Sequence, residues 1–164
     1  MRLEHYITLG VALLAFTHFS VADTATSVSH PGEKIMHAKG PFDVKLAPLE
    51  GYNKQLGRMS LDKQFHGDLE AVSQGEMLSF LDREKQSGGY VAIERVTGAL
   101  GGKKGSFVFQ HSSTMTRGKP AQNIIVVPDS GTDGLVGLSG AMVVNIADGG
   151  AHSYDFEYTF DETK

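Results

Sequence analysis

The sequence contains no cysteine among its 164 residues. This absence excludes disulfides, thiolate nucleophiles and zinc sites with thiolate ligands. The chain also lacks an excess of basic residues, because 15 Lys and Arg stand against 19 Asp and Glu and give a net charge of -4. A mildly acidic surface argues against nucleic acid or an anionic membrane as the main partner. The fold must therefore be stabilised by packing alone.

The N-terminal segment lacks the length of a membrane-spanning helix. Its apolar run from Ile7 to Phe19 is interrupted by His18 and is shorter than the roughly 20 residues that a spanning helix needs. Arg2 precedes the run and small residues end it at Ala22, which is typical of a secretory signal peptide. We therefore expect a signal peptide at residues 1–22, cleaved after Ala22, and a flexible leader at residues 23–34. The protein is predicted to be periplasmic or secreted, without a stable membrane anchor after processing.

Long helical patterns are missing from the rest of the chain, where apolar and polar residues alternate in eight segments. One predicted strand runs from Arg58 to Ala71, and a turn at Gln74-Gly75 leads into the next. Strands joined mainly by hairpins, with no helices to cover a sheet, favour one closed barrel over a two-sheet sandwich. We predict an all-β domain at residues 35–161, a closed eight-stranded antiparallel β-barrel. At most one short helical turn is expected near residues 132–138, capped by Thr132 or Asp133.

A glycine-rich reversal joins two of these strands between Gly88 and Met115. With Gly102-Lys103 as a two-residue loop, the hairpin register places Glu94 directly opposite His111. Both side chains then lie on the face that is otherwise apolar, because side chains alternate with a period of two.

Glu94 and His111 are the candidate catalytic residues, as an acid and a base within a low-dielectric barrel. The alternative is a buried ion pair that only determines the strand register. Lys63 shares the apolar side of its strand with Leu61 and Phe65, so its amine is expected either to meet an anionic ligand or, as we favour, to extend to the barrel rim. The full set of candidate ligand-binding residues is Lys63, Tyr90, Phe107, Phe109, Tyr154, Phe156 and Tyr158.

Other chemistries find no support in the sequence. His66, Asp68 and Glu70 are metal-ligand types on one predicted strand, but no second histidine has a suitable spacing, so we predict no metal. No G-x-S-x-G motif marks a serine hydrolase. The glycine run before Lys103 lacks the Ser or Thr of a phosphate-binding loop. No cofactor is predicted.

Four segments carry a resemblance to a known family: GRMSLDKQFHGDLEA, YVAIERVTG, GSFVFQHSSTM and VVPDSGTDGLVGLSG. They resemble a bacterial domain-of-unknown-function family grouped with the allene oxide cyclase-like barrels. The resemblance covers roughly residues 35 to 160, a single domain. It implies an eight-stranded antiparallel barrel with an internal cavity and a tendency to oligomerise. The residue motifs of the plant cyclases are absent, so their activity is not carried over.

Three functions fit these observations. The first is the binding of a small, mainly apolar molecule with a polar or anionic end in the barrel interior. The second is a cofactor-independent isomerase or cyclase that uses Glu94 and His111. The third is an oligomeric structural protein with a filled core, for which Val91, Ile93 and Val108 on the outer face would supply an interface. Enzymatic activity therefore stays open at this point.

Overall fold

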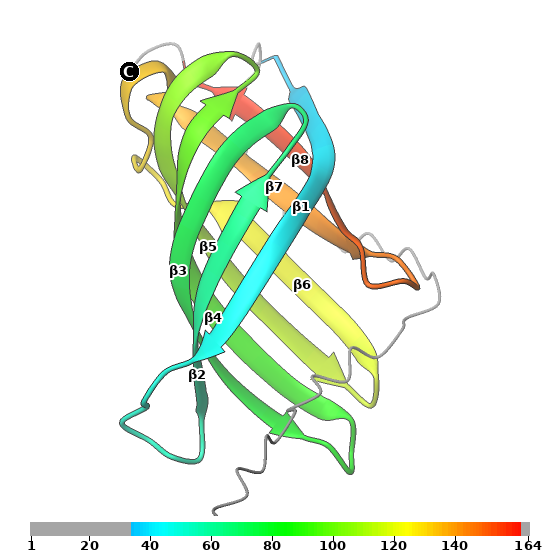
Figure 1. The fold of residues 1–164 in the computed structure, drawn as a ribbon. Helices are drawn as coiled ribbons and strands as arrows, with labels where there is room; N and C mark the ends of the chain where they lie inside the picture. The colour runs from blue at the N-terminus through cyan, green and yellow to red at the C-terminus, as the bar shows by residue number, and fades with distance from the viewer. Residues whose placement is uncertain (1–33, 162–164) are drawn as a thin grey trace, which may run out of the picture.

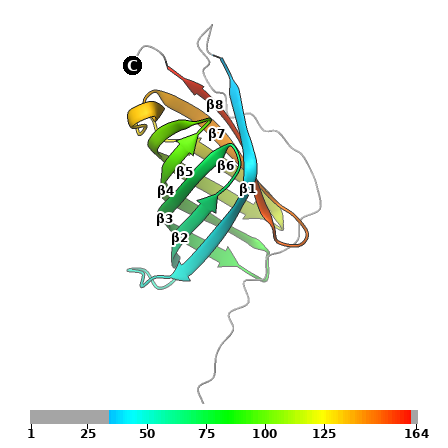
Figure 2. The same cartoon turned by 45° about the horizontal axis from the view of Figure 1, so that its top comes forward.

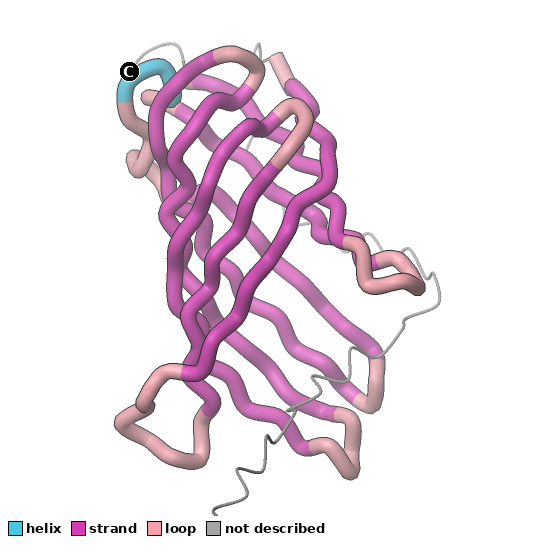
Figure 3. The backbone as a smooth tube through the Cα atoms, in the orientation of Figure 1, coloured by secondary structure: helices cyan, strands magenta, loops and turns pink. Residues whose placement is uncertain are grey.

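A computed structural model describes residues 34–161, so the predicted signal peptide and nearly all of the predicted leader lie outside the described residues. The described chain forms eight strands that pair in sequence order and close into one antiparallel barrel (Figures 1 and 3). This confirms the predicted fold class. The strands are β1 (Met36–Pro48), β2 (Gly57–Phe65), β3 (Leu69–Asp82), β4 (Ser87–Leu100), β5 (Lys103–Thr116), β6 (Lys119–Val126), β7 (Leu138–Ile146) and β8 (His152–Phe160).

The turn between β2 and β3 was predicted at the wrong place. The chain reverses at residues 66–68, where Gly67 adopts a φ of 92°, and β3 continues through Gln74 and Gly75 without a turn. Gly75 serves another purpose, because it lies directly opposite Glu94 on β4. A Cβ atom at position 75 would lie 2.7 Å from the Cβ of Glu94, so the glycine permits close approach of the two strands.

The predicted register of the β4–β5 hairpin was also wrong, by two residues. The loop consists of Gly101 and Gly102, with φ angles of 55° and 82°, because a two-residue turn of this kind needs positive φ at both positions. Glu94 therefore lies opposite Phe109, and His111 lies opposite Ala92. Since a shift of two residues preserves the face, both side chains still point into the barrel.

The predicted helical turn is present as η1 (Asp133–Leu135), and within the described residues it is the one helical element. Thr132 occupies the N-cap position, but its side chain makes no cap hydrogen bond. Its hydroxyl instead accepts a hydrogen bond of 3.0 Å from the backbone N–H of Ser106 on β5. Leu135 is buried in the hydrophobic core of the barrel. No helix among residues 34–161 is long and apolar enough to cross a membrane.

The barrel interior divides into two halves. The half that includes the β2–β3 turn, the β4–β5 turn and η1 is packed with buried side chains, and we call it the closed half. Its members include Phe65, Leu69, Leu100, Phe107, Leu135, Phe156 and Tyr158. The other half lies toward the β3–β4 and β5–β6 hairpins, which extend beyond the β7–β8 hairpin in Figure 1 and can be followed from another side in Figure 2. Its inward-facing side chains are partly buried or exposed, and we call it the open half.

Candidate functional site

The side chain of Glu94 lies at the boundary between the two halves. Glu94 is 0% exposed in the middle of β4, where the surrounding positions alternate between buried and exposed. Burial of an unpaired carboxylate would strongly destabilise the fold, so the Glu94 carboxylate needs hydrogen-bonding and charged partners at this position. The absence of a side chain at Gly75, directly opposite on β3, leaves room for the carboxylate to reach groups on neighbouring strands.

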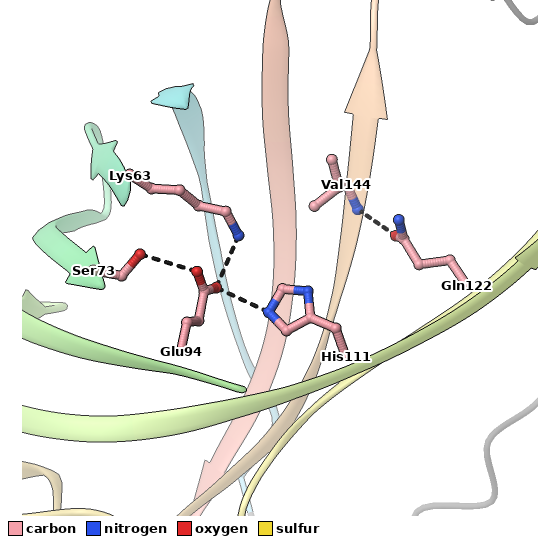
Figure 4. Close-up of polar contacts among 6 residues, drawn as sticks. All are labelled: Lys63, Ser73, Glu94, His111, Gln122 and Val144. Carbon is pink, nitrogen blue, oxygen red and sulfur yellow. Dashed lines mark hydrogen bonds and ion pairs between the residues drawn. The ribbon is translucent and has the colours of Figure 1, made fainter. Parts of the chain in front are cut away.

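Three donors from three other strands surround the Glu94 carboxylate (Figure 4). Its Oε1 atom lies 2.8 Å from Lys63 Nζ of β2 and 2.9 Å from His111 Nε2 of β5. Its Oε2 atom accepts a hydrogen bond of 3.0 Å from Ser73 Oγ of β3. All three partners are buried, with exposed fractions of 8% for Lys63, 3% for His111 and 2% for Ser73. We call these four residues the Glu94 cluster.

The Glu94 cluster keeps its carboxylate ionised. Burial by itself would raise the pKa of Glu94, but the hydrogen bond from His111 and the charge of Lys63 outweigh it and lower this pKa from 4.5 to about 2. An ionised carboxylate only accepts hydrogen bonds. The proton in the contact with His111 therefore belongs to Nε2.

The second ring nitrogen of His111 is left available. Nδ1 points away from Glu94 in Figure 4 and has no hydrogen-bond partner among the described residues. Every fully buried side-chain nitrogen and oxygen in residues 34–161 does have a partner, so Nδ1 is not fully enclosed. His111 lies one cross-strand row nearer to the open half than Glu94, because it pairs with Ala92. The imidazole thus presents Nδ1 to the open half.

Lys63 does not extend to the barrel rim, which corrects the favoured interpretation of the sequence. Its amine points inward to Glu94 and lies 5.4 Å from the ring centre of Phe42 and 5.5 Å from that of Phe65. These distances are typical of cation–π contacts. The charged group is held in the interior by one carboxylate and two aromatic faces, and only one of its N–H groups is used by a hydrogen bond among the described residues.

The inner surface of the open half is formed by flexible apolar side chains and a few polar ones. Met59 and Met77 are paired across β2 and β3, and Met115 lies on the inner face of β5. Methionine side chains adapt readily to the shape of an apolar partner. Tyr90 and Ser113 lie opposite one another on β4 and β5 in the same half. Burial raises the pKa of Tyr90, so its hydroxyl stays neutral.

The barrel wall has a weak seam between β6 and β7. These strands share a single backbone pair, Ile125 with Ala141, whereas β4 and β5 pair along their whole length. Continuing that register toward the open half would place Gln122 opposite Val144. There the Gln122 side chain closes the seam, because its Oε1 accepts a hydrogen bond of 3.0 Å from the Val144 N–H (Figure 4).

Most of the predicted ligand-binding aromatic residues belong to the closed half. Phe107 packs against Phe109 and Phe156 at ring-centre distances of 4.8 and 6.1 Å. Phe156 also packs against Tyr158 at 5.2 Å. The Tyr154 hydroxyl accepts a hydrogen bond from Leu69 N and donates one to His66 O, so it fastens β8 to the β2–β3 turn. Tyr90 and Lys63 are the predicted residues that lie at or next to the open half.

The barrel surface carries two hollows, and Lys63 and Ser73 of the Glu94 cluster are among the residues that line the second one. One, of about 630 Å³, is lined mainly by outward-facing residues of β3 to β6, including Leu78, Phe80, Val91 and Ser112. The other, of about 540 Å³, lies over β1 to β3. No group of three or more His, Cys, Asp and Glu residues within residues 34–161 is arranged to hold a metal ion. His66, Asp68 and Glu70 lie around a turn instead of on one strand face.

Three residues of the site were not predicted from the sequence. Ser73 appeared to lie next to a turn, and only the true course of β3 brings it beside Lys63. Gln122 and His152 carried no pattern that distinguished them from other polar strand residues. His152 faces inward on β8, and its ring lies tilted by 51° against that of Phe42 at a ring-centre distance of 5.2 Å.

The chain is similar to known proteins in sequence and in fold. Residues 38–158 match a family described as "Protein of unknown function (DUF3224)". The chain is also similar to a crystal structure, at 1.84 Å resolution, of a protein with unknown function from the DUF3224 family of Shewanella oneidensis MR-1. The two chains share 47% identity with a TM-score of 0.73, and the match covers 78% of this chain and 99% of that chain. No curated protein matches this chain. The protein therefore belongs to the DUF3224 family.

Proposed function

We propose that this protein binds a small amphipathic molecule in the open half of its barrel, with the polar end of the molecule at the Glu94 cluster. The observation that carries this proposal is the unused Nδ1 of His111, which faces the open half while Nε2 is held by Glu94. A purely structural ion pair would have no need to orient the second imidazole nitrogen toward the open half. Binding sites typically combine apolar walls with a few convergent polar groups.

The composition of the open half supports an apolar partner for the rest of the molecule. Met59, Met77 and Met115 supply adaptable apolar surface, and their side chains are only partly buried. Tyr90 and Ser113 add two hydroxyl groups between this surface and His111. A molecule with one polar end and a flexible apolar body would therefore contact both the methionine surface and the polar groups beside His111.

Native mass spectrometry of the protein isolated from its own organism tests this proposal. We expect a bound small molecule that is released on denaturation. The variant Ser113→Phe places a large side chain in the open half and should remove the bound molecule while the barrel stays folded.

Ser112→Phe is the matched control, because residue 112 faces the outer hollow one position away. It should leave the bound molecule in place. Loss of the molecule in Ser112→Phe and retention in Ser113→Phe would place binding in the outer hollow and refute the proposal.

A second candidate function follows from the same imidazole. A carboxylate at Nε2 and a free Nδ1 are the arrangement of a general base with its positioning residue, which favours a cofactor-independent isomerase or cyclase. Together with this second function, we propose that the protein is a member of the allene oxide cyclase-like superfamily. Glu94→Gln separates the two functions once a ligand is known. A binder should keep much of its affinity, whereas an enzyme should lose turnover with the ligand still bound.

We further propose that the chain is exported and that it forms a homo-oligomer. The outer patch of Leu78, Phe80, Val91 and Ile93 is exposed and apolar, which supports an interface on β3 and β4. Light scattering of the wild type and of Val91→Lys tests oligomerisation.

N-terminal sequencing of the protein from its own organism tests the proposed export through cleavage after Ala22.

A further inference from the structure

We propose that the molecule held in the open half is an organic monoacid, and that His111 takes up a proton at Nδ1 when the carboxylate binds. This inference rests on the proposed function, because it names the chemical class of the ligand. In the bound state the carboxylate would lie against Nδ1 of His111 and the unused N–H groups of Lys63.

The charge balance of the Glu94 cluster is the first reason. Lys63 contributes one positive charge and Glu94 one negative charge, and the two are in direct contact at 2.8 Å. A second carboxylate in this buried region would leave an uncompensated negative charge, which is strongly unfavourable. A proton on Nδ1 turns the imidazole into an imidazolium between the two carboxylates and restores neutrality.

The direction of the hydrogen bonds is the second reason. Because Nε2 already donates to Glu94, the protonation state of His111 changes only at Nδ1, on the side of the open half. When the acid enters, its O–H bond breaks and an N–H bond forms at Nδ1. When the carboxylate enters from neutral solution, the same proton comes from solvent. Either route ends with an imidazolium–carboxylate pair.

The other ionisable groups around the barrel interior are not placed to take up a proton when the carboxylate binds. On β4, Tyr90 faces the open half, but burial and the charge of Glu94 raise its pKa, so it keeps its proton. On β8, His152 faces inward beside Phe42, but no carboxylate contacts it among the described residues. The inner faces of β1, β6 and β7 present no ionisable side chain at this level in the described chain. His111 is therefore the group that accepts the proton.

Isothermal titration calorimetry with octanoate as the probe tests the inference. Titrations near pH 8 in buffers of different ionisation enthalpy report the protons taken up, and we expect about one proton per octanoate. Affinity should fall by up to about tenfold per pH unit as the pH rises, since the bound state holds the extra proton. The neutral probe 1-octanol should bind without proton uptake.

Three variants test whether His111 is the residue that takes up the proton. His111→Gln should abolish the uptake, whereas His66→Gln, on the outer surface, and His152→Gln should retain it. If His111→Gln fails to fold, ¹⁵N NMR of the wild-type imidazoles replaces it. Octanoate should then change the shift of His111 Nδ1 and leave that of Nε2 in its protonated range.

Two outcomes would overturn the inference while the proposed function stands: octanoate binding without proton uptake, or binding of 1-octanol but not of octanoate. Loss of uptake in His152→Gln would overturn the assignment to His111. Failure of both octanoate and 1-octanol to bind would count against the inference and the proposed function together.

Discussion

Glu94 and Gly75 occupy directly opposed positions on β4 and β3, and there is no space for a side chain at position 75. A Cβ atom there would meet the Cα and Cβ atoms of Glu94 at 2.7 Å. The glycine is therefore part of the site, because it lets the carboxylate lie over β3 and reach Ser73 and Lys63.

Gly75→Ala should destabilise the barrel by about 1–3 kcal/mol, since overpacking forces the two strands apart. Urea denaturation measures this loss. Gly149→Ala is the control, because a Cβ atom at position 149 has no neighbour within 4 Å. Equal stabilities of the two variants would show that the close approach at Gly75 is unimportant.

Glu94→Gln should lower the free energy of unfolding by more than the loss of one hydrogen bond would. It leaves the buried ammonium of Lys63 without a counter-charge, and breaking a buried pair in this way typically costs about 3–5 kcal/mol. The double variant Glu94→Gln with Lys63→Met should recover part of this loss, because it removes the stranded charge. A double-mutant cycle in urea measures the coupling, and strict additivity of the two changes would show that Glu94 and Lys63 do not stabilise one another.

Acid should remove the stabilisation that Glu94 provides. The folded-state pKa of Glu94 is lowered to about 2 from 4.5, so this contribution is complete above the unfolded value. It is lost as the pH falls from about 4.5 toward 2, and its size is on the order of 3 kcal/mol. Stability curves of the wild type and Glu94→Gln should therefore converge over this range. A constant difference between the curves from pH 6 to pH 2 would contradict the assignment.

Gln122→Ala should loosen the seam between β6 and β7. The amide of Val144 donates to the Gln122 side chain, so its hydrogen exchange should accelerate in the variant. Gln110→Ala, on the exposed outer side of β5, is the control and should leave this amide unchanged. Unchanged exchange of Val144 in Gln122→Ala would show that the side chain does not hold the seam.

The alternation of apolar and polar residues was sufficient to predict the barrel, because a period of two determines which face of each strand is buried. It also placed Glu94 and His111 on the inner face despite the incorrect hairpin register, since an error of two residues leaves the face unchanged. The course of β3 was not predictable from the same pattern. Gly75 resembles a turn residue, and its close approach to Ile93 and Glu94 on the neighbouring strand explains it.

The inward orientation of Lys63 was not predictable for a related reason. Its acidic partner is 31 positions away in the sequence, and Ser73 completes the cluster only when β2, β3 and β4 are correctly paired. Local patterns specify the face of a side chain, whereas the depth of a charged group depends on partners that the strand pairing brings together.

A crystal structure of the protein with octanoate would show directly whether a carboxylate binds at the Glu94 cluster. We expect a carboxylate within hydrogen-bonding distance of His111 Nδ1 and Lys63 Nζ, with the alkyl chain among Met59, Met77 and Met115. The Glu94 contacts at 2.8 and 2.9 Å should persist in that complex. Octanoate bound only in the hollow beside Phe80 and Val91, or an open half that stays filled by its own side chains, would contradict it.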